Sequence, residues 1–235
     1  MSLFKRLGGV FFDPKRTLTA LAEKPVWVDV LIVILVALAV YSLAVMPYMR
    51  AEQYQMMKDS DKLKDRMGAD QFNGYVQKYA APPTKWDYIQ TAGGAPVMFV
   101  IAMLLQSLFL MLLGRFASTQ GTFKQLFSSL VHANLIYALL GNGIRLILTL
   151  TKKSAMQVST GLAIFFPKME ITSTSYIVLS QFDFFQIWLF GVLAFGLSAL
   201  FKINIRKALF ISYAVWFLKA LANIGIALFG LSFVR

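Results

Sequence analysis

Long continuous apolar runs alternate with polar segments along this chain. The runs VLIVILVALAV (30–40) and FVIAMLL (99–105) lack the alternation of β-barrel strands, so they predict helices. A helix needs roughly 20 residues to cross the hydrocarbon core of a bilayer. The pattern predicts one all-α domain, residues 1–235, that crosses a membrane five times. The predicted spans are 28–48, 95–114, 125–148, 183–201 and 208–231.

The segment before the first span predicts two short amphipathic helices. Phe4, Leu7, Val10 and Phe11 recur at helical spacing, and the pattern breaks before Pro14. Such helices can lie on the inner leaflet of the membrane, and a partly ordered cytoplasmic tail is the alternative.

The first outer loop, 49–94, predicts one or two further amphipathic helices. Glycines at 68 and 74 interrupt its helical spacing before Pro82 and Pro83. Fewer than 50 residues cannot build much of a core alone. The loop is either a docking surface for a partner outside the membrane or a lid that rests on the bundle.

Composition supports a membrane protein. Of the 235 residues 58% are hydrophobic and 14% are charged, whereas an ordinary soluble domain carries about 25% charged residues. The absence of cysteine excludes disulfides, thiolate metal sites and cysteine nucleophiles.

The distribution of charge predicts a cytoplasmic N-terminus and a C-terminus on the outer side. The segments expected inside share 43 residues with 10 basic and 2 acidic side chains, and those expected outside share 84 residues with 11 basic and 7 acidic ones. The net charge of +12 is therefore a topology signal, with anionic lipid headgroups as neighbours of the inner basic residues. Nucleic-acid binding is not expected, because no basic run is interleaved with an exposed aromatic platform. The inner segments are 1–27, 115–124 and 202–207, and the outer ones are 49–94, 149–182 and 232–235.

Polar residues within the spans are candidate functional residues, because they are costly in lipid. Ser212, Lys219 and Asn223 fall on one side of the fifth span, and His132 and Asn134 lie in the third. These five residues form the candidate intramembrane polar site, which suits an anionic group or a gating charge. The alternative is a lysine that snorkels toward the interface or pairs with a carbonyl.

Arg145 and Asp183 lie at comparable depth near the outer ends of the third and fourth spans. They are a candidate interhelix ion pair of structural value. Gly141-Asn142-Gly143 predicts a kink or break in the third span, or else close packing at small residues.

Catalysis is not expected. Ser198 and His132 could occupy similar depths, but serine chemistry also needs a base within reach and oxyanion donors. The chain has no HExxH helix, zinc set or phosphate-binding glycine loop. We therefore expect no catalytic, cofactor-binding or metal-binding residues.

Three stretches carry a family resemblance: FFDPKRTLTALAEKPVW (11–27), FKQLFSSLVHANL (123–135) and SQFDFFQIWLFGVLAFGLSA (180–199). Together they resemble the prokaryotic branch of the Yip (Ypt/Rab-interacting protein) domain family. The resemblance implies a five-helix integral membrane protein with a cytoplasmic N-terminus, here in a bacterial inner membrane. Eukaryotic members act in vesicle traffic and bind Rab-type GTPases. This chain lacks their long N-terminal region and DLxGP signature, which argues against GTPase binding.

Two functions remain open at this stage. One is a non-catalytic accessory or scaffold subunit of a membrane transport or trafficking assembly, with a membrane-protein partner such as a transporter subunit. The other is a small permease or channel whose polar path is lined by Lys219 and Asn223.

Overall fold

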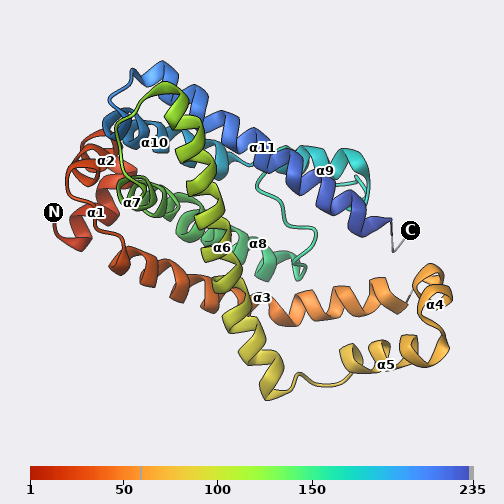
Figure 1. Ribbon diagram of the computed structural model, residues 1–235. Coiled ribbons are helices and arrows are strands. Elements are labelled where there is room, and N and C mark those ends of the chain that lie inside the picture. Colours follow the sequence, from red (N-terminus) through yellow and green to blue (C-terminus); the bar gives the residue numbers. More distant parts are fainter. Residues whose placement is uncertain (59, 233–235) are drawn as a thin grey trace.

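The computed structural model describes residues 1–58 and 60–232, and these residues form helices and loops without a β-strand (Figure 1). Five helical segments in this part of the chain are long and apolar enough to cross a membrane. The predicted all-α polytopic fold is therefore confirmed. The predicted outer C-terminus, residues 233–235, lies outside the described residues. The five segments are α3 (Val28–Lys58), α6 (Lys85–Ala117), α7 to α8 (Phe123–Lys152), α10 (Phe184–Phe201) and α11 (Ile205–Leu231).

Helices α3 and α6 are longer than the spans assigned to them from sequence. They contain 31 and 33 residues, which at 1.5 Å per residue gives lengths of about 46 and 50 Å. The hydrocarbon core is about 30 Å thick. Both helices therefore tilt or extend beyond it, and ten residues that follow the predicted first span, 49–58, continue α3.

The remainder of the first outer segment folds into α4 (Asp61–Met67) and α5 (Ala69–Ala80). These are the predicted amphipathic helices of the loop. Gly68 joins them with a φ of +78°, a conformation that glycine adopts without strain. Figure 1 shows the pair beside the far end of α3, well away from the N-terminal helices.

Arg50 fastens this outer pair to the long helices. Its Nη2 atom donates to the carbonyl oxygens of Lys78 (2.8 Å) and Ala81 (2.9 Å), at the end of α5. Its Nη1 atom lies 3.7 Å from Asp87 Oδ2, in the first turn of α6. One guanidinium thus joins α3, α5 and α6.

Glu52, half a turn further along α3, holds the second outer segment. Its carboxylate accepts hydrogen bonds from the Ser154 hydroxyl and from the backbone N–H groups of Ala155 and Met156, the latter two at 2.9 Å. The C-terminal end of α3 therefore anchors both segments that the sequence predicts to lie outside.

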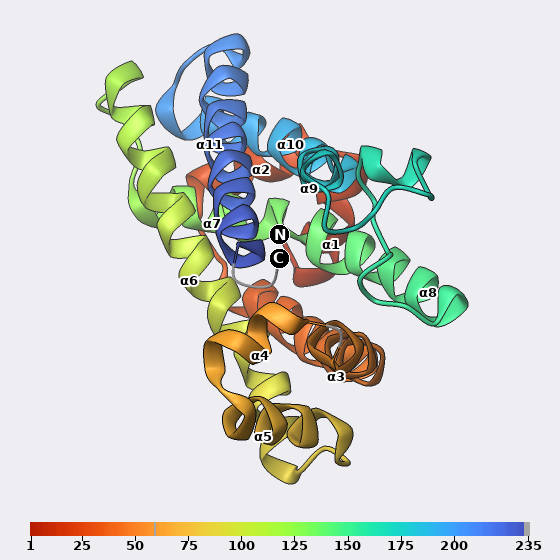
Figure 2. The ribbon, with the colours of Figure 1, turned by 90° about the vertical axis from the view of Figure 1, so that its right-hand side faces the viewer.

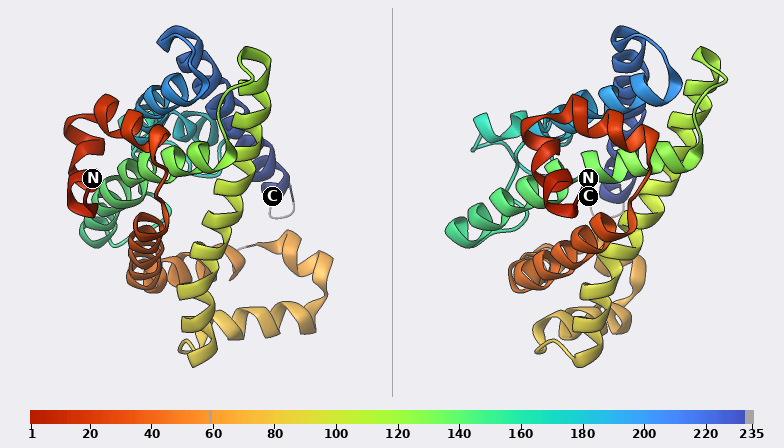
Figure 3. Two further views of the ribbon diagram at one scale, coloured as in Figure 1. Left: turned by 60° about the vertical axis from the view of Figure 1, so that its left-hand side comes forward. Right: turned by 90° about the vertical axis from the view of Figure 1, so that its left-hand side faces the viewer.

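The N-terminal helices α1 (Leu3–Phe12) and α2 (Pro14–Glu23) pack against α7 and α10 (Figure 3). Val10 and Leu18 are fully buried, whereas Phe12 is 91% exposed. These are the two short helices that the sequence predicts before the first span. Their apolar faces join the core of the bundle, where α10 presents the small residue Gly196 to Ser129 of α7 and to Leu18.

The third membrane-crossing segment is irregular at its centre. Between α7 (Phe123–Ala133) and α8 (Asn142–Lys152), residues Ile136–Gly141 form a π-helical turn, η1. It ends where the glycines around Asn142 predicted a kink. A Cβ atom on Gly141 would lie 3.2 Å from the Phe185 ring, so a small residue here allows α10 to approach closely.

Candidate intramembrane polar site

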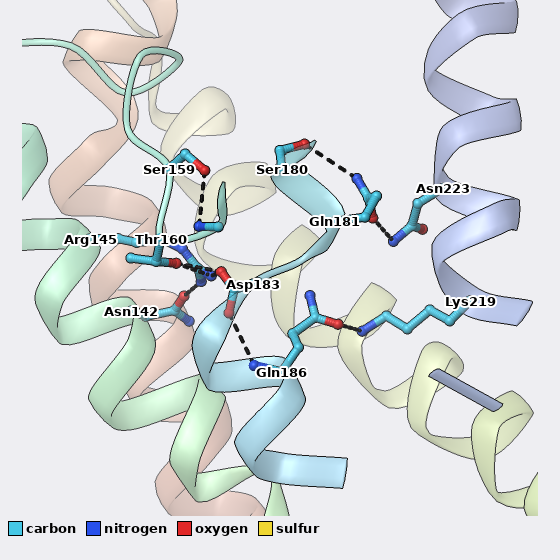
Figure 4. Close-up of polar contacts among 11 residues, drawn as sticks. Asn142, Arg145, Ser159, Thr160, Ser180, Gln181, Asp183, Gln186, Lys219 and Asn223 are labelled. Atoms are coloured by element: carbon cyan, nitrogen blue, oxygen red, sulfur yellow. Dashed lines mark hydrogen bonds and ion pairs between the residues drawn. The ribbon is translucent and has the colours of Figure 1, made fainter. Parts of the chain in front are cut away.

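An ion pair between Arg145 and Asp183 forms the centre of a polar cluster at one end of α8 and α10 (Figure 4). Arg145 Nη2 lies 2.6 Å from Asp183 Oδ2, and the two side chains are only 13% and 5% exposed. Asp183 is the N-cap of α10, where its Oδ1 atom accepts from the Gln186 backbone N–H at 3.0 Å. The carboxylate therefore neutralises a buried cation and satisfies a helix end at once.

The remaining bonds of the pair come from neighbouring polar side chains. Arg145 donates to Asn142 Oδ1 at 2.8 Å and to Thr160 Oγ1 at 2.9 Å. The Thr160 hydroxyl also donates to Asp183 Oδ2. The Arg145 guanidinium lies over the Tyr137 ring, 4.4 Å from its centroid. Both terminal nitrogens of this guanidinium thus donate to protein groups, as a buried charge requires.

The loop that carries Thr160 is held against the start of α10 by its backbone. The Thr160 carbonyl accepts from Phe184 N–H at 3.2 Å, and Gly161 pairs with Asp183 in an isolated antiparallel bridge. A Cβ atom at Gly161 would lie 2.7 Å from the Ser180 carbonyl oxygen. A residue larger than glycine would push the loop away from the ion pair.

Lys219 extends the cluster to α11. Its Nζ atom donates to Gln186 Oε1 at 2.9 Å (Figure 4). The same atom lies 5.7 Å from the centroid of the Tyr137 ring, over which the Arg145 guanidinium also lies. Asn223, one turn further along α11, donates to Gln181 Oε1 at 3.1 Å. Gln181 ends α9 (Thr174–Gln181), so the polar face of α11 meets the junction of α9 and α10.

The five residues of the predicted intramembrane site do not form one cluster. Lys219 and Asn223 join the Arg145–Asp183 pair as described, and Ser212 donates to the Phe190 carbonyl at 2.6 Å, nearer the other end of α11. Asn134 donates to Leu130 O of its own helix at 2.9 Å. In the described part of the chain, no hydrogen bond joins His132 or Asn134 to the three residues of α11.

His132 belongs to a second cluster with the N-terminal helix. It is fully buried in α7, with Nδ1 2.8 Å from the Ser128 carbonyl oxygen and Nε2 3.4 Å from Arg6 Nη1. Arg6 of α1 is 5% exposed and forms an ion pair with Asp29 at the start of α3. This cluster fastens α1 to α3 and α7.

Comparison with family models identifies the chain. The model of the Yip1 domain matches residues 8–227, nearly the whole chain. The chain belongs to the Yip1 domain family. No curated protein and no solved structure matches it. The match includes the first four membrane-crossing segments, α11 as far as residue 227, and both polar clusters of this Yip1 domain apart from Arg6.

Sequence reasoning missed several residues that complete the two clusters of the Yip1 domain. Four of them are neutral and did not stand out in the sequence as costly in lipid: Asn142, Thr160, Gln181 and Gln186. Gln186 follows Asp183 by three residues and so shares its helix face. Arg6 gave no signal either, because nothing in its neighbourhood indicated that it contacts a residue 126 positions away.

Proposed function

We propose that this Yip1-domain protein is a non-catalytic accessory or scaffold subunit of a membrane transport or trafficking assembly. In this proposal the protein lies in a bacterial inner membrane with its N-terminus in the cytoplasm. The support for a non-catalytic role is the family, together with the polar site. The charged and amide groups of that site are bonded to one another: Arg145 to Asp183, Lys219 to Gln186 and Asn223 to Gln181.

The bonding of the site favours a structural role over transport. A site that binds a solute needs polar groups directed at an open path, and intramembrane charges in transporters line such paths. Here the bonds link α8, α9, α10 and α11 and the loop at Thr160 (Figure 4). Bonds between helices hold a bundle in one arrangement, which is the property a scaffold requires.

The outer helices α4 and α5 offer a surface for a membrane-protein partner. Lys64, Asp65, Asp70 and Tyr75 are exposed on them, and Tyr75 is 48% exposed. Arg50 holds the end of α5 in place, so this surface is presented in a defined position. Exposed aromatic residues such as Tyr75 are enriched at protein interfaces.

The permease remains the second candidate, because one observation favours it. Arg145 and Lys219 lie over the same Tyr137 ring, and among the described residues Asp183 is the one carboxylate bonded to either of them. Two cations with one carboxylate leave a local positive charge that suits an anionic solute.

Purification from native membranes tests the accessory role. We would isolate the tagged protein in a mild detergent, with a photo-crosslinking residue in place of Tyr75, and identify what is attached in fixed proportion. A membrane-transport or trafficking subunit crosslinked from position 75 supports the role, provided that the same residue placed at Lys152 gives no such product.

Reconstituted vesicles test the alternative. Solute flux by the purified protein alone, abolished by Lys219→Leu, would overturn the accessory role and support the permease. Partner binding that persists in Lys219→Leu is the expected result for a scaffold.

A further inference from the structure

A groove opens between the end of α6 and the beginning of α11. Its volume is about 500 Å³. Leu113, Phe116, Phe210 and Ala214 form its apolar floor, and Arg206 and Lys207 stand beside it in the first turn of α11. Figures 1 and 2 both place these two helix ends together, at the opposite end of α6 from α5.

The two cations at the groove have no polar partner among the described residues. Both side chains are exposed, and in the described residues neither the Arg206 guanidinium nor the Lys207 ammonium makes a hydrogen bond or ion pair. Arg115, at the end of α6, differs, because it donates to the carbonyl oxygens of Thr119, Gln120 and Gly121. The groove therefore has free positive charge at one edge and apolar side chains on its floor.

The two loops that flank the groove carry charge of one sign. These loops, 115–124 and 202–207, contain five basic residues and no acidic ones. No carboxylate in either loop is available to neutralise Arg206 or Lys207. Within the described residues, Arg206 and Lys207 therefore lack a counter-ion, and an anion from outside the chain can supply it.

We propose that this groove binds an anionic glycerophospholipid, with its phosphate headgroup against Arg206 and Lys207 and an acyl chain along the apolar floor. Charge complementarity and position select this occupant. A basic pocket between transmembrane helices binds anionic headgroups, and the apolar floor lies on the membrane-crossing faces of α6 and α11. Arginine and lysine are also the residues that recognise phosphate.

The site is independent of the accessory role proposed above. It uses neither the Arg145–Asp183 cluster nor the outer helices α4 and α5, so either proposal can fail without the other. The bound lipid would fill the gap between α6 and α11 at the cytoplasmic end of the bundle.

Native mass spectrometry of the detergent-purified protein tests the site. The protein is mixed with equimolar phosphatidylglycerol and phosphatidylcholine that carry identical acyl chains. We expect one phosphatidylglycerol adduct to dominate, and Arg206→Gln/Lys207→Gln to reduce its affinity roughly 10- to 30-fold, as expected for loss of two cationic contacts. Equal binding of the two lipids, or an unchanged adduct in this variant, would overturn the proposal.

Two matched variants separate the groove from general attraction to basic protein. Lys15→Gln/Lys124→Gln removes the same charge from exposed positions that do not line the groove, and it should retain the adduct. Ala214→Phe keeps both cations and fills the floor, and it should lose the adduct. Loss of the lipid adduct in Lys15→Gln/Lys124→Gln, or its retention in Ala214→Phe, contradicts the proposed site. Unchanged helix content by circular dichroism confirms that each variant is folded.

Discussion

The ammonium of Lys219 and the side-chain oxygen of Gln186 meet at 2.9 Å, so a lysine well inside a membrane-crossing helix is bonded to a neutral amide. The carboxylate of the same cluster, Asp183, is bonded instead to Arg145 and Thr160. The two cations of the site therefore have different kinds of partner. Substitutions should distinguish them clearly.

Loss of the Asp183 carboxylate should strongly destabilise the protein. Asp183→Asn leaves the Arg145 guanidinium buried without its counter-ion, which costs about 3–5 kcal/mol for a buried pair, and weakens the N-cap of α10. Thermal unfolding in detergent measures the effect. Asp70→Asn, which removes an exposed acidic residue from the first turn of α5, should cost less than about 1 kcal/mol. Equal melting temperatures for the two variants would contradict a structural role for the ion pair.

Substitution of Gln186 should lower the stability of the protein more when Lys219 is present than when Lys219 is absent. Gln186→Leu leaves the ammonium without its bond and should cost about 2–3 kcal/mol. Lys219→Met/Gln186→Leu removes both partners, and we expect it to be as stable as the wild type or more stable. The same unfolding measurement checks both variants. A double variant less stable than Gln186→Leu would show that the two residues do not act as a pair.

The close packing of Gly114 against Phe201 should make a methyl group at position 114 destabilising. A Cβ atom there would lie 2.0 Å from Phe201 Cζ, whereas nothing lies within 4 Å of one at Gly225. Gly114→Ala should lose about 1–3 kcal/mol through overpacking, while Gly225→Ala should gain up to about 1 kcal/mol from helix propensity. Phe201→Leu should restore part of the loss at Gly114 if the clash is its cause. Unfolding curves for the three variants decide the point.

The cluster of Arg6, Asp29 and His132 should hold α1 against α3 and α7. The chain has no cysteine, so a single Val10→Cys reports exposure of a residue that is fully buried. Adding Arg6→Gln should raise its thiol labelling rate at least severalfold, because α1 loses its ion pair to Asp29. Lys5→Cys, on the exposed side of the same helix, should label at the same rate with and without Arg6→Gln. An unchanged rate at position 10 would mean that apolar packing alone holds α1.

Single cysteines also test the proposed orientation. Lys124→Cys and Asn73→Cys occupy exposed positions in segments predicted to lie inside and outside, respectively. In intact cells a membrane-impermeant maleimide should label position 73 and leave position 124 unlabelled, and inverted membrane vesicles should give the reverse. The opposite pattern would place the N-terminus outside.

The helical architecture was predictable because a bilayer imposes a length on every crossing segment. Helix ends were harder to place, since α3 continues for ten residues beyond its predicted span, held by the contacts of Arg50 and Glu52. Local sequence cannot contain those contacts, because Arg50 reaches residues 28 and 31 positions away and Glu52 reaches residues more than 100 positions away.

The polar site was predictable only where its members are charged. Arg145, Asp183 and Lys219 could be identified because charge is costly in lipid. Their neutral partners, Thr160 and Gln186 among them, are common at helix ends and gave no comparable signal. His132 was grouped with the wrong neighbours, because its partner Arg6 comes from a helix that was expected on the membrane surface.

Helix α3 joins two sets of contacts that lie on opposite sides of the bundle. Arg50 and Glu52 near its far end hold both outer segments, and Asp29 in its first turn holds Arg6 of the N-terminal helix. Within the described chain, one continuous helix therefore connects the outer loops mechanically to the N-terminal pair. A partner that pulls or rotates α5 applies force to α3 directly, and Pro47 is the point along this helix where such force would bend it.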